Sequence, residues 1–289
     1  MSKKPLSAMP RKALTGAAIA GVVTLLAGCS QGIENGALPS TPDITNQTET
    51  VITLWNGSWI AALTVGVLTW GLILWCVAVY RKRKDDHKLP VQNRVHLPLE
   101  LMYTALPLMA IAVLFKYTAE DIGELTSLDA EPDLEIQVVG KQWSWDFNYL
   151  SDDVYDPGVQ ATLTGEEGVE ETLPTLYLPV DETVHFYLDS RDVIHSFWIP
   201  AFLYKEDTVP GRTNEWQVTP TEVGTYQGKC AELCGEYHAS MLFNVEVVER
   251  AEYDAHMEDL RARGYEGELG LEYSRDQVVE MTTDHGETE

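Results

Sequence analysis

The sequence is poor in cysteine and in basic residues. Only four cysteines occur among 289 residues, too few for a domain held together by a disulfide scaffold. Lysine and arginine together number 20, against 45 aspartates and glutamates, so the formal net charge is −25. This balance argues against nucleic acid as a partner, because proteins that bind it carry basic patches.

Charged residues are missing altogether from residues 50–80. The run is apolar, with Trp55 near one end and Trp75 near the other. Its length is sufficient to cross a bilayer, and tryptophan is typical of both membrane interfaces. We therefore expect a transmembrane helix over residues 51–80.

A basic loop follows this helix. Consecutive basic residues fill positions 81–84, and the positive-inside rule then places the loop 81–96 in the cytoplasm. Residues 97–117 form a second apolar run, interrupted by Pro107, which a transmembrane helix tolerates when neighbouring groups satisfy the freed carbonyl. The predicted topology places the N-terminus, and everything after the second helix, outside the cytoplasm.

Residues 1–28 are typical of an export signal. A basic segment precedes an apolar core at 13–27, as in signal peptides. The core ends in Leu26-Ala27-Gly28-Cys29, which resembles a bacterial lipoprotein box and makes Cys29 the expected lipidated residue. A plain signal peptide or a first membrane anchor is the alternative. Residues 29–50 are rich in small and polar types, and we interpret them as an extended, exported linker.

The rest of the chain changes from long apolar runs to short alternating ones. Segments bounded by Gly, Pro, Asp or Ser predict strands at 134–139, 143–149, 176–180, 183–188, 212–218, 224–229 and 242–248. Strands of this length and spacing predict a β-sandwich, which we place at residues 131–249. Residues 151–174 are interpreted as an acidic surface insert. Residues 250–289 are expected to form an amphipathic helix followed by a mobile acidic tail from residue 264 onward.

Four potential metal donors lie close together near the end of the sandwich. Cys230, Cys234, His238 and Met241 are spaced by four, four and three residues. Soft sulfur donors beside imidazole select copper, zinc or iron–sulfur clusters. The thioether favours copper, because zinc takes thiolate, imidazole or carboxylate, whereas a weak Met ligand is typical of electron-transfer copper. A single blue copper ion needs only one Cys, so the second thiolate indicates two ions that share both sulfurs.

Two ions that share the sulfurs need one more histidine. His195 lies upstream in an apolar, strand-like segment and is the candidate, while the other histidines lack such neighbours. The alternative is a disulfide between Cys230 and Cys234, because exported chains form disulfides. Four donors in register favour copper over that alternative.

This pattern, His195 followed after a long gap by Cys-x3-Cys-x3-His-x2-Met, resembles the binuclear copper site of cytochrome c oxidase subunit II. The resemblance implies a two-helix transmembrane hairpin followed by an all-β, cupredoxin-like Greek-key sandwich. It also implies that the chain accepts electrons from cytochrome c and passes them to haem in subunit I. There oxygen is reduced to water, coupled to proton pumping. Subunit III is a further implied partner.

The resemblance implies roles for three more residues. Trp143, in Gln142-Trp143-Ser144-Trp145, takes the place of the tryptophan over the copper site through which electrons enter, although Ser144 departs from the family's aromatic residue. Glu100 begins a Glu-x3-Thr-x2-Pro pattern and matches a glutamate at the mouth of a proton pathway. Glu232 is expected to offer its carbonyl to copper and its carboxylate to Mg²⁺ shared with subunit I. Without the resemblance, Trp143 would be interpreted as a core tryptophan and Glu232 as a surface acid. Glu100, an ionisable residue near the end of a membrane helix, would stay open between a functional residue and one whose side chain reaches water.

Three other proteins fit parts of the pattern. A quinol oxidase subunit II shares the helices and the sandwich but lacks the copper ligands. A copper-delivery protein would leave the matches at Glu100 and Trp143 unexplained. The copper domain of nitrous oxide reductase shares the ligand loop without the two helices.

The expected surroundings are the bacterial cell membrane and its lipid. The electron donor stays open between a soluble cytochrome c and a membrane-bound one in a supercomplex with a cytochrome bc complex. In either case the acidic exterior would steer a basic donor to the chain.

Overall fold

The structure is a computed structural model that describes residues 35–82, 91–160 and 172–270. The predicted signal peptide and Cys29 therefore lie outside the described residues. The chain divides into two compact units, residues 1–38 and residues 39–289. All helices and strands below belong to the second unit.

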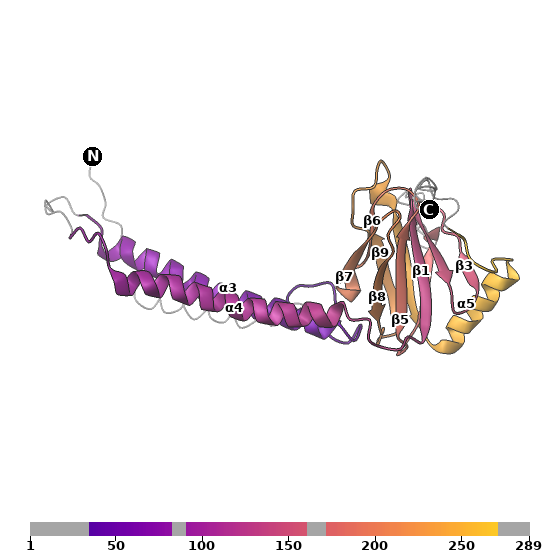
Figure 1. Ribbon diagram of the computed structural model, residues 1–289, viewed down its shortest axis with the longest axis horizontal. Helices are drawn as coiled ribbons and strands as arrows, with labels where there is room; N and C mark the ends of the chain where they lie inside the picture. Colours follow the sequence, from indigo (N-terminus) through magenta and orange to yellow (C-terminus); the bar gives the residue numbers. More distant parts are fainter. Residues whose placement is uncertain (1–34, 83–90, 161–171, 271–289) are drawn as a thin grey trace, which may run out of the picture. The chain divides into compact units, whose positions relative to one another are not determined.

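Two long apolar helices, α3 (Thr48–Val79) and α4 (Leu97–Leu125), precede the β-rich part of the chain (Figure 1). Both are long and apolar enough to cross a membrane, which confirms the predicted pair of helices. Helix α4 continues past the apolar segment predicted at 97–117. An ion pair at 2.7 Å between Lys116 and Glu120, one helical turn apart, supports this continuation.

Among the described residues, ten strands form two five-stranded sheets. The first sheet has the order β3-β2-β1-β5-β8 and the second the order β4-β10-β9-β6-β7. The strands are β1 (Leu134–Lys141), β2 (Ser144–Tyr149), β3 (Val154–Asp156), β4 (Thr175–Pro179), β5 (Val184–Ser190), β6 (His195–Ile199), β7 (Tyr204–Thr208), β8 (Asn214–Val218), β9 (Gly224–Cys230) and β10 (Leu242–Val248). The two sheets pack together around one core, so the predicted β-sandwich is confirmed.

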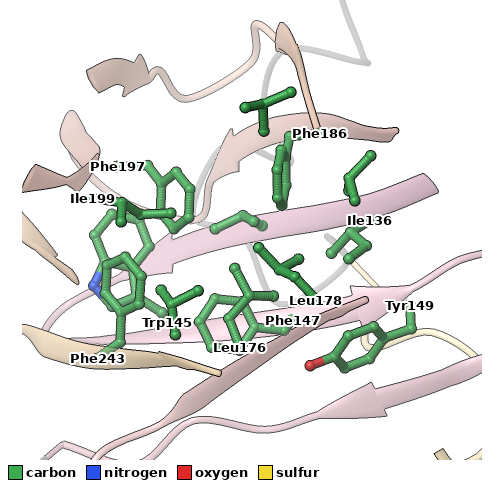
Figure 2. Close-up of a cluster of buried hydrophobic side chains, with 14 of the residues drawn as sticks. Ile136, Trp145, Phe147, Tyr149, Leu176, Leu178, Phe186, Phe197, Ile199 and Phe243 are labelled. Carbon is green, nitrogen blue, oxygen red and sulfur yellow. The ribbon is translucent and has the colours of Figure 1, made fainter. Parts of the chain in front are cut away.

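The core follows the alternation of each strand. In β1 the inward residues Ile136 and Val138 are fully buried, and in β10 Phe243 and Val245 are buried in the same way. Aromatic rings join the two sheets: Trp145 of β2 packs edge-on against Phe243 with 5.6 Å between ring centres (Figure 2). Each fully buried large apolar side chain contributes about 1.5–3 kcal/mol to stability.

Gly228 allows the ring of Phe243 to lie across β9. The two residues are direct partners between β9 and β10, and a Cβ atom at position 228 would lie 2.0 Å from the ring. The same ring stacks on Phe197 of β6, with centres 4.9 Å apart and planes at 9°. Phe197 is in turn the direct partner of Cys230 between β6 and β9, so this layer of rings lies next to the predicted metal donors.

Three strands were not among those predicted: β3, β6 and β7. Strand β6 coincides with the strand-like segment around His195, and β7 returns beside it as a hairpin. Strand β3 lies within residues 151–174, so the interpretation of that segment as a surface insert is wrong for its first part. A strand of three residues is too short to show an alternating pattern. It forms because it pairs with β2, and it becomes the edge of the first sheet.

The linker before α3 is not an extended tether along its whole length. Its last residues run beside the chain that follows β8, where the N–H of Asn46 donates to the carbonyl of Thr219 at 3.0 Å. Gln47 is buried, and its Nε2 donates to the carbonyl of Gln217 at 2.9 Å. Its Oε1 accepts from the indole N–H of Trp216 at 3.1 Å. The expectation failed because composition does not reveal hydrogen bonds to a distant part of the chain.

Helix α5 (Arg250–Ala262) packs on the sandwich beside β3 and β4 (Figure 1). Its buried residues recur at the predicted helical spacing: Tyr253, Met257 and Leu260.

The prediction of a mobile tail from residue 264 onward is wrong for its first part. The N–H of Tyr155 donates to the carbonyl of Tyr265 at 3.1 Å, and the N–H of Leu269 donates to Oδ1 of Asn148 at 3.0 Å. These bonds hold residues 265–269 against β3 and β2. A segment with few apolar side chains is thus fixed by backbone hydrogen bonds.

His256 makes the stability of the sandwich depend on pH. Its ring stacks on Tyr177 with centres 3.7 Å apart, and burial, helped by the charge of Arg263, lowers the pKa of His256 to about 4. In the unfolded chain the pKa of histidine is about 6.5, so the unfolded state binds the proton first. The stabilisation is therefore present above about pH 6.5 and is lost as the pH falls toward 4.

The variant His256→Phe keeps the stacked ring but does not titrate. We expect its melting temperature to fall less than that of the wild type between about pH 6.5 and pH 4. The measurement is circular dichroism on the metal-free full chain in detergent, so that loss of metal in acid does not contribute. Identical pH profiles for the two proteins would contradict this assignment.

Candidate metal centre

Three connections between strands meet at one end of the sandwich. Strand β1 turns into β2 at residues 142–143, and β5 lies parallel to β1, so it ends at the same edge. From there the chain passes through residues 191–194 into β6. Strand β9 ends at Cys230 beside the start of β6, where the N–H of Ala231 donates to the carbonyl of Ser196 at 3.0 Å. We call these three connections, residues 142–143, residues 191–194 and the loop 231–241 that leads from β9 into β10, the rim.

Alternation within the strands brings three of the predicted donors to the end of the core. His195 lies two residues before the buried Phe197, so both side chains face inward from β6. Cys230 lies two residues after the buried Gly228 of β9, and Met241 lies two residues before the buried Phe243 of β10. The exposed fractions of His195, Cys230 and Met241 are 0%, 4% and 0%, so water has almost no access to them.

The donor atoms form a series of short contacts. Nδ1 of His195 lies 3.9 Å from Sγ of Cys230, which lies 3.9 Å from Sγ of Cys234. Sγ of Cys234 lies 3.6 Å from Nδ1 of His238 and 3.8 Å from Sδ of Met241. The two sulfurs therefore occupy the middle, with one imidazole beside each of them.

The loop between β9 and β10 is folded tightly enough to place its donors side by side. Gly235 has a φ of 127°, in the region that favours glycine, and His238 begins a short 3₁₀ helix, His238–Ser240. The carbonyl of Glu232 accepts a hydrogen bond from the thiol of Cys230 at 3.1 Å. The side chain of Glu232 is exposed, so carbonyl and carboxylate have different surroundings.

The two thiols differ in acidity. Burial is the largest single influence and opposes ionisation of Cys230, but several hydrogen bonds, led by the one with His195, together outweigh it and lower the pKa of Cys230 to about 7. Burial raises the pKa of Cys234, and the neighbouring Cys230 raises it further, to about 12. Without metal, the pair of thiols therefore loses its first proton near neutral pH and keeps the second. A metal ion would replace both protons, because thiolate is the ligand form.

The geometry fits a metal ion and not a disulfide. A disulfide needs a sulfur–sulfur distance of about 2.05 Å, but the two sulfurs lie 3.9 Å apart and both thiols are free. Two sulfurs bound at about 2.3 Å to one tetrahedral ion would be about 3.8 Å apart. Within the described ranges, His195, Cys230 and Cys234 are the one group of His, Cys, Asp or Glu side chains close enough to share a metal ion. The soft donors fit copper.

The ring of Trp143 lies against the ligand loop. It packs edge-on against Tyr237 with 4.9 Å between ring centres. A Cβ atom at Gly235 would come within 3.1 Å of the indole, so only a residue without a side chain lets the ring approach this closely. The structure thus brings Trp143 beside the residue that follows Cys234, and its role in electron transfer stays a prediction.

The structure gives Glu100 a local contact at the start of α4. Its Oε1 accepts from the backbone N–H of His96 at 2.8 Å, while Nδ1 of His96 accepts from the N–H of Leu99 at 3.3 Å. This reciprocal pairing resembles a capping box in which the acid stands one position later than usual, and it satisfies N–H groups at the start of the helix. The predicted roles of Glu100 in proton uptake and of Cys29 in lipidation stay predictions.

Two residues of the site were missed by the sequence analysis. Asp192 accepts from Nε2 of His195 at 2.8 Å, and Gln142 donates from Nε2 to the carbonyl of Cys234 at 2.7 Å. The first could have been found, because a carboxylate close to a ligand histidine is a common partner of its second nitrogen. The second could not, because 92 residues separate its partners.

Comparison with known proteins points to one family. Residues 134–248 match the family model described as the periplasmic domain of cytochrome c oxidase subunit II. A protein of Streptomyces coelicolor, named probable cytochrome c oxidase subunit 2, is 42% identical over 299 residues, covering 92% of either chain. Cytochrome c oxidase subunit 2 of Mycobacterium bovis is 32% identical over 253 residues, covering 71% of this chain and 70% of its own.

Among solved structures, the periplasmic domain of cytochrome oxidase subunit II from Bradyrhizobium japonicum is 31% identical. The match covers 46% of this chain and 97% of that one, with a TM-score of 0.43.

Gly140 provides a test of the position of His195. A Cβ atom at Gly140 would lie 2.9 Å from Cδ2 of His195 and 3.0 Å from Oγ1 of Thr208, so the Gly140→Ala variant must displace the imidazole. We expect copper affinity to fall about tenfold to a hundredfold, as when the support of a ligand is disturbed. The measurement is competition with a chelator.

The matched control is Gly224→Ala on β9. There the nearest atom to the added methyl group would be the hydroxyl of Tyr226, at 3.3 Å. Equal copper affinity in the two variants would show that His195 does not hold copper in the position described.

Proposed function

The chain belongs to the cytochrome c oxidase subunit II family, whose members are subunits of haem–copper oxidases, and on this premise we propose its specific role. It accepts single electrons from cytochrome c at a binuclear copper centre and passes them to haem in subunit I. Oxygen is reduced to water there, coupled to proton pumping. The observation that carries this proposal is the convergence of two thiols, two imidazoles and a thioether at the rim, all of them buried except the half-buried His238.

Six groups of this chain are proposed to hold the copper. His195 and His238 each bind one ion, Cys230 and Cys234 are shared by both, and the remaining positions go to Met241 and the Glu232 carbonyl. Two copper ions that share two thiolates spread one electron over both metals, so each bond changes little. The protein fixes these donors on β6, on β9 and in the loop that follows β9, and it buries His195, both thiols and Met241 away from water, which favours electron transfer over ligand exchange.

Electrons are proposed to enter through the ring of Trp143. Three apolar side chains of the rim are unusually exposed: Leu233 is 77% exposed, Ile194 45% and Tyr237, which contacts Trp143, 43%. An exposed apolar patch on a charged protein is typical of a docking surface. With a net charge of −25, the chain favours a basic donor such as cytochrome c. Whether the donor is soluble or part of a supercomplex with a cytochrome bc complex is left open.

Glu232 is proposed to join this chain to subunit I. Its exposed carboxylate is available to a hard cation, and Mg²⁺ prefers oxygen ligands and keeps part of its water shell. The ion would then lie between Glu232 and groups of subunit I. Subunit III is the further proposed partner.

The chain is a membrane protein, with two helices able to span the membrane and the sandwich as its periplasmic domain. We propose that the first helix crosses outward to inward, the loop 81–96 is cytoplasmic, and Cys29 carries a lipid anchor. Glu100 then lies near the cytoplasmic start of α4, where it is proposed to help protons enter subunit I. Its hydrogen bond to the N–H of His96 would hold the carboxylate in place.

Copper content tests the binuclear centre. The full chain in detergent, loaded with copper and freed of excess, is expected to hold two copper ions and to show several visible bands. The variant Cys234→Ser removes one of the shared thiolates, so we expect the copper content to fall and the multiband spectrum to be lost. A colourless wild-type protein holding copper would instead favour a copper carrier.

The variant Trp143→Phe tests the route of electrons. Stopped-flow mixing of reduced cytochrome c with the copper-loaded full chain is expected to show a rate lowered about tenfold or more. A small inorganic reductant that reaches the copper without docking should react at an unchanged rate. The control is Trp198→Phe on β6, whose indole lies 4.5 Å from the ammonium group of Lys229. Equal loss in both variants would contradict the role of Trp143.

A further inference from the structure

The carboxylate of Asp192 is shared between a predicted copper ligand and the turn that carries Trp143. Its Oδ1 accepts from Nε2 of His195 at 2.8 Å and from the backbone N–H of Val193 at 2.7 Å. Its Oδ2 accepts from the backbone N–H of Gln142 at 2.7 Å. One side chain therefore spans the connection into β6 and the turn between β1 and β2.

The contact with Asp192 decides which nitrogen of His195 is free. A carboxylate only accepts hydrogen bonds, so Nε2 of His195 must carry the hydrogen. Nδ1, which lies 3.9 Å from Sγ of Cys230, then presents its lone pair toward the two sulfurs. Asp192 thus selects the form of the imidazole that can bind a metal ion beside the thiolates.

Gln142 fixes the turn between β1 and β2 through two hydrogen bonds. Its backbone N–H donates to Asp192, and its side chain binds the loop 231–241. Nε2 of Gln142 donates to the carbonyl of Cys234 at 2.7 Å. A Cβ atom at Gly235 would lie 3.1 Å from both this amide and the indole of Trp143, so no slack separates the turn from the ligand loop. The indole is held against the loop 231–241.

We propose that Asp192 is a positioning residue that uses its two oxygens to hold His195 and the Trp143 turn in one fixed arrangement. The inference rests on the proposed function, because it concerns how electrons pass from Trp143 to the copper. If Asp192 were purely structural, its side chain would stabilise only its own loop, residues 191–194. A positioning role requires that its two contacts can be separated by experiment.

The variants Asp192→Asn and Asp192→Ala separate the contact with His195 from the contact with Gln142. In Asp192→Asn, the amide oxygen can still accept from Nε2 of His195, but the NH₂ group then faces the N–H of Gln142, and two donors repel. We expect this variant to keep its copper content and visible spectrum. Its electron transfer from cytochrome c should fall about tenfold or more, since small displacements are costly in such sites. In Asp192→Ala both contacts are lost, and copper affinity should fall about tenfold to a hundredfold as well.

The matched control is Asp189→Asn at the end of β5. Asp189 is also buried, at 5% exposure, and it accepts from Gln137 at 2.8 Å and from Thr213 at 2.6 Å. It bonds to neither His195 nor Gln142 in the described structure. We expect this variant to match the wild type in spectrum and in rate.

A second measurement needs neither copper nor activity. Hydrogen–deuterium exchange of the metal-free full chain, followed by mass spectrometry of the peptide that contains Gln142 and Trp143, reports on the turn. Both substitutions at position 192 should speed exchange there, and Asp189→Asn should not. This result would stand even if the alanine variant failed to load copper.

The outcomes distinguish this inference from the proposed function. If the copper-loaded wild type accepts no electrons from cytochrome c, the proposed function fails. If the wild type does accept them, and Asp192→Asn matches Asp189→Asn in rate and in exchange, Asp192 does not position Trp143. Loss of the copper spectrum in Asp192→Asn, with unchanged exchange of the turn, would likewise overturn the shared role.

Discussion

The pairing of β9 with β6 is the interaction on which the metal centre depends. His195 and Cys230 are 35 residues apart in the chain, yet backbone hydrogen bonds across these strands bring their side chains to the same end of the core. The N–H of Cys230 donates to the carbonyl of Met241 at 3.0 Å, which adds β10 to the same frame. The entropy of assembling the donors is therefore lost when the sandwich folds and not when a metal binds.

Much of this could be predicted from the sequence, because it depends on short spacings and on regular alternation. Cys230, Cys234, His238 and Met241 lie within one loop, so their spacing alone indicates a shared site. The two helices and most strands follow from apolar runs and period-two patterns. His195 was found as a donor because the cluster lacked a second imidazole, although its strand β6 was not among those predicted.

What could not be predicted depends on single hydrogen bonds between distant segments. Gln47 in the linker, Leu269 near the C-terminus and Gln142 beside Trp143 all lie in segments whose composition favours turns or loops. Each is held by a partner far along the chain: Gln217, Asn148 and Cys234. Alternation and spacing carry no information about such contacts, because only the folded sheets decide which polar groups meet. Strand β3 was missed for another reason: it has only three residues and forms by pairing with the neighbouring β2 in a local hairpin.

Gln47 shows how such contacts join the two long helices to the sandwich. Its buried amide bonds to Gln217 and Trp216 at the end of β8, and it also lies 3.5 Å from the carbonyl of Leu125 in the last turn of α4. One satisfied side chain thus joins the start of α3, the end of α4 and the sandwich. A flexible linker in the place of this junction would let the distance between the helices and the sandwich vary. Under the proposed function, electrons would leave toward a haem held by another subunit, and a buried glutamine with all its polar atoms bonded would serve that transfer better than a loose tether.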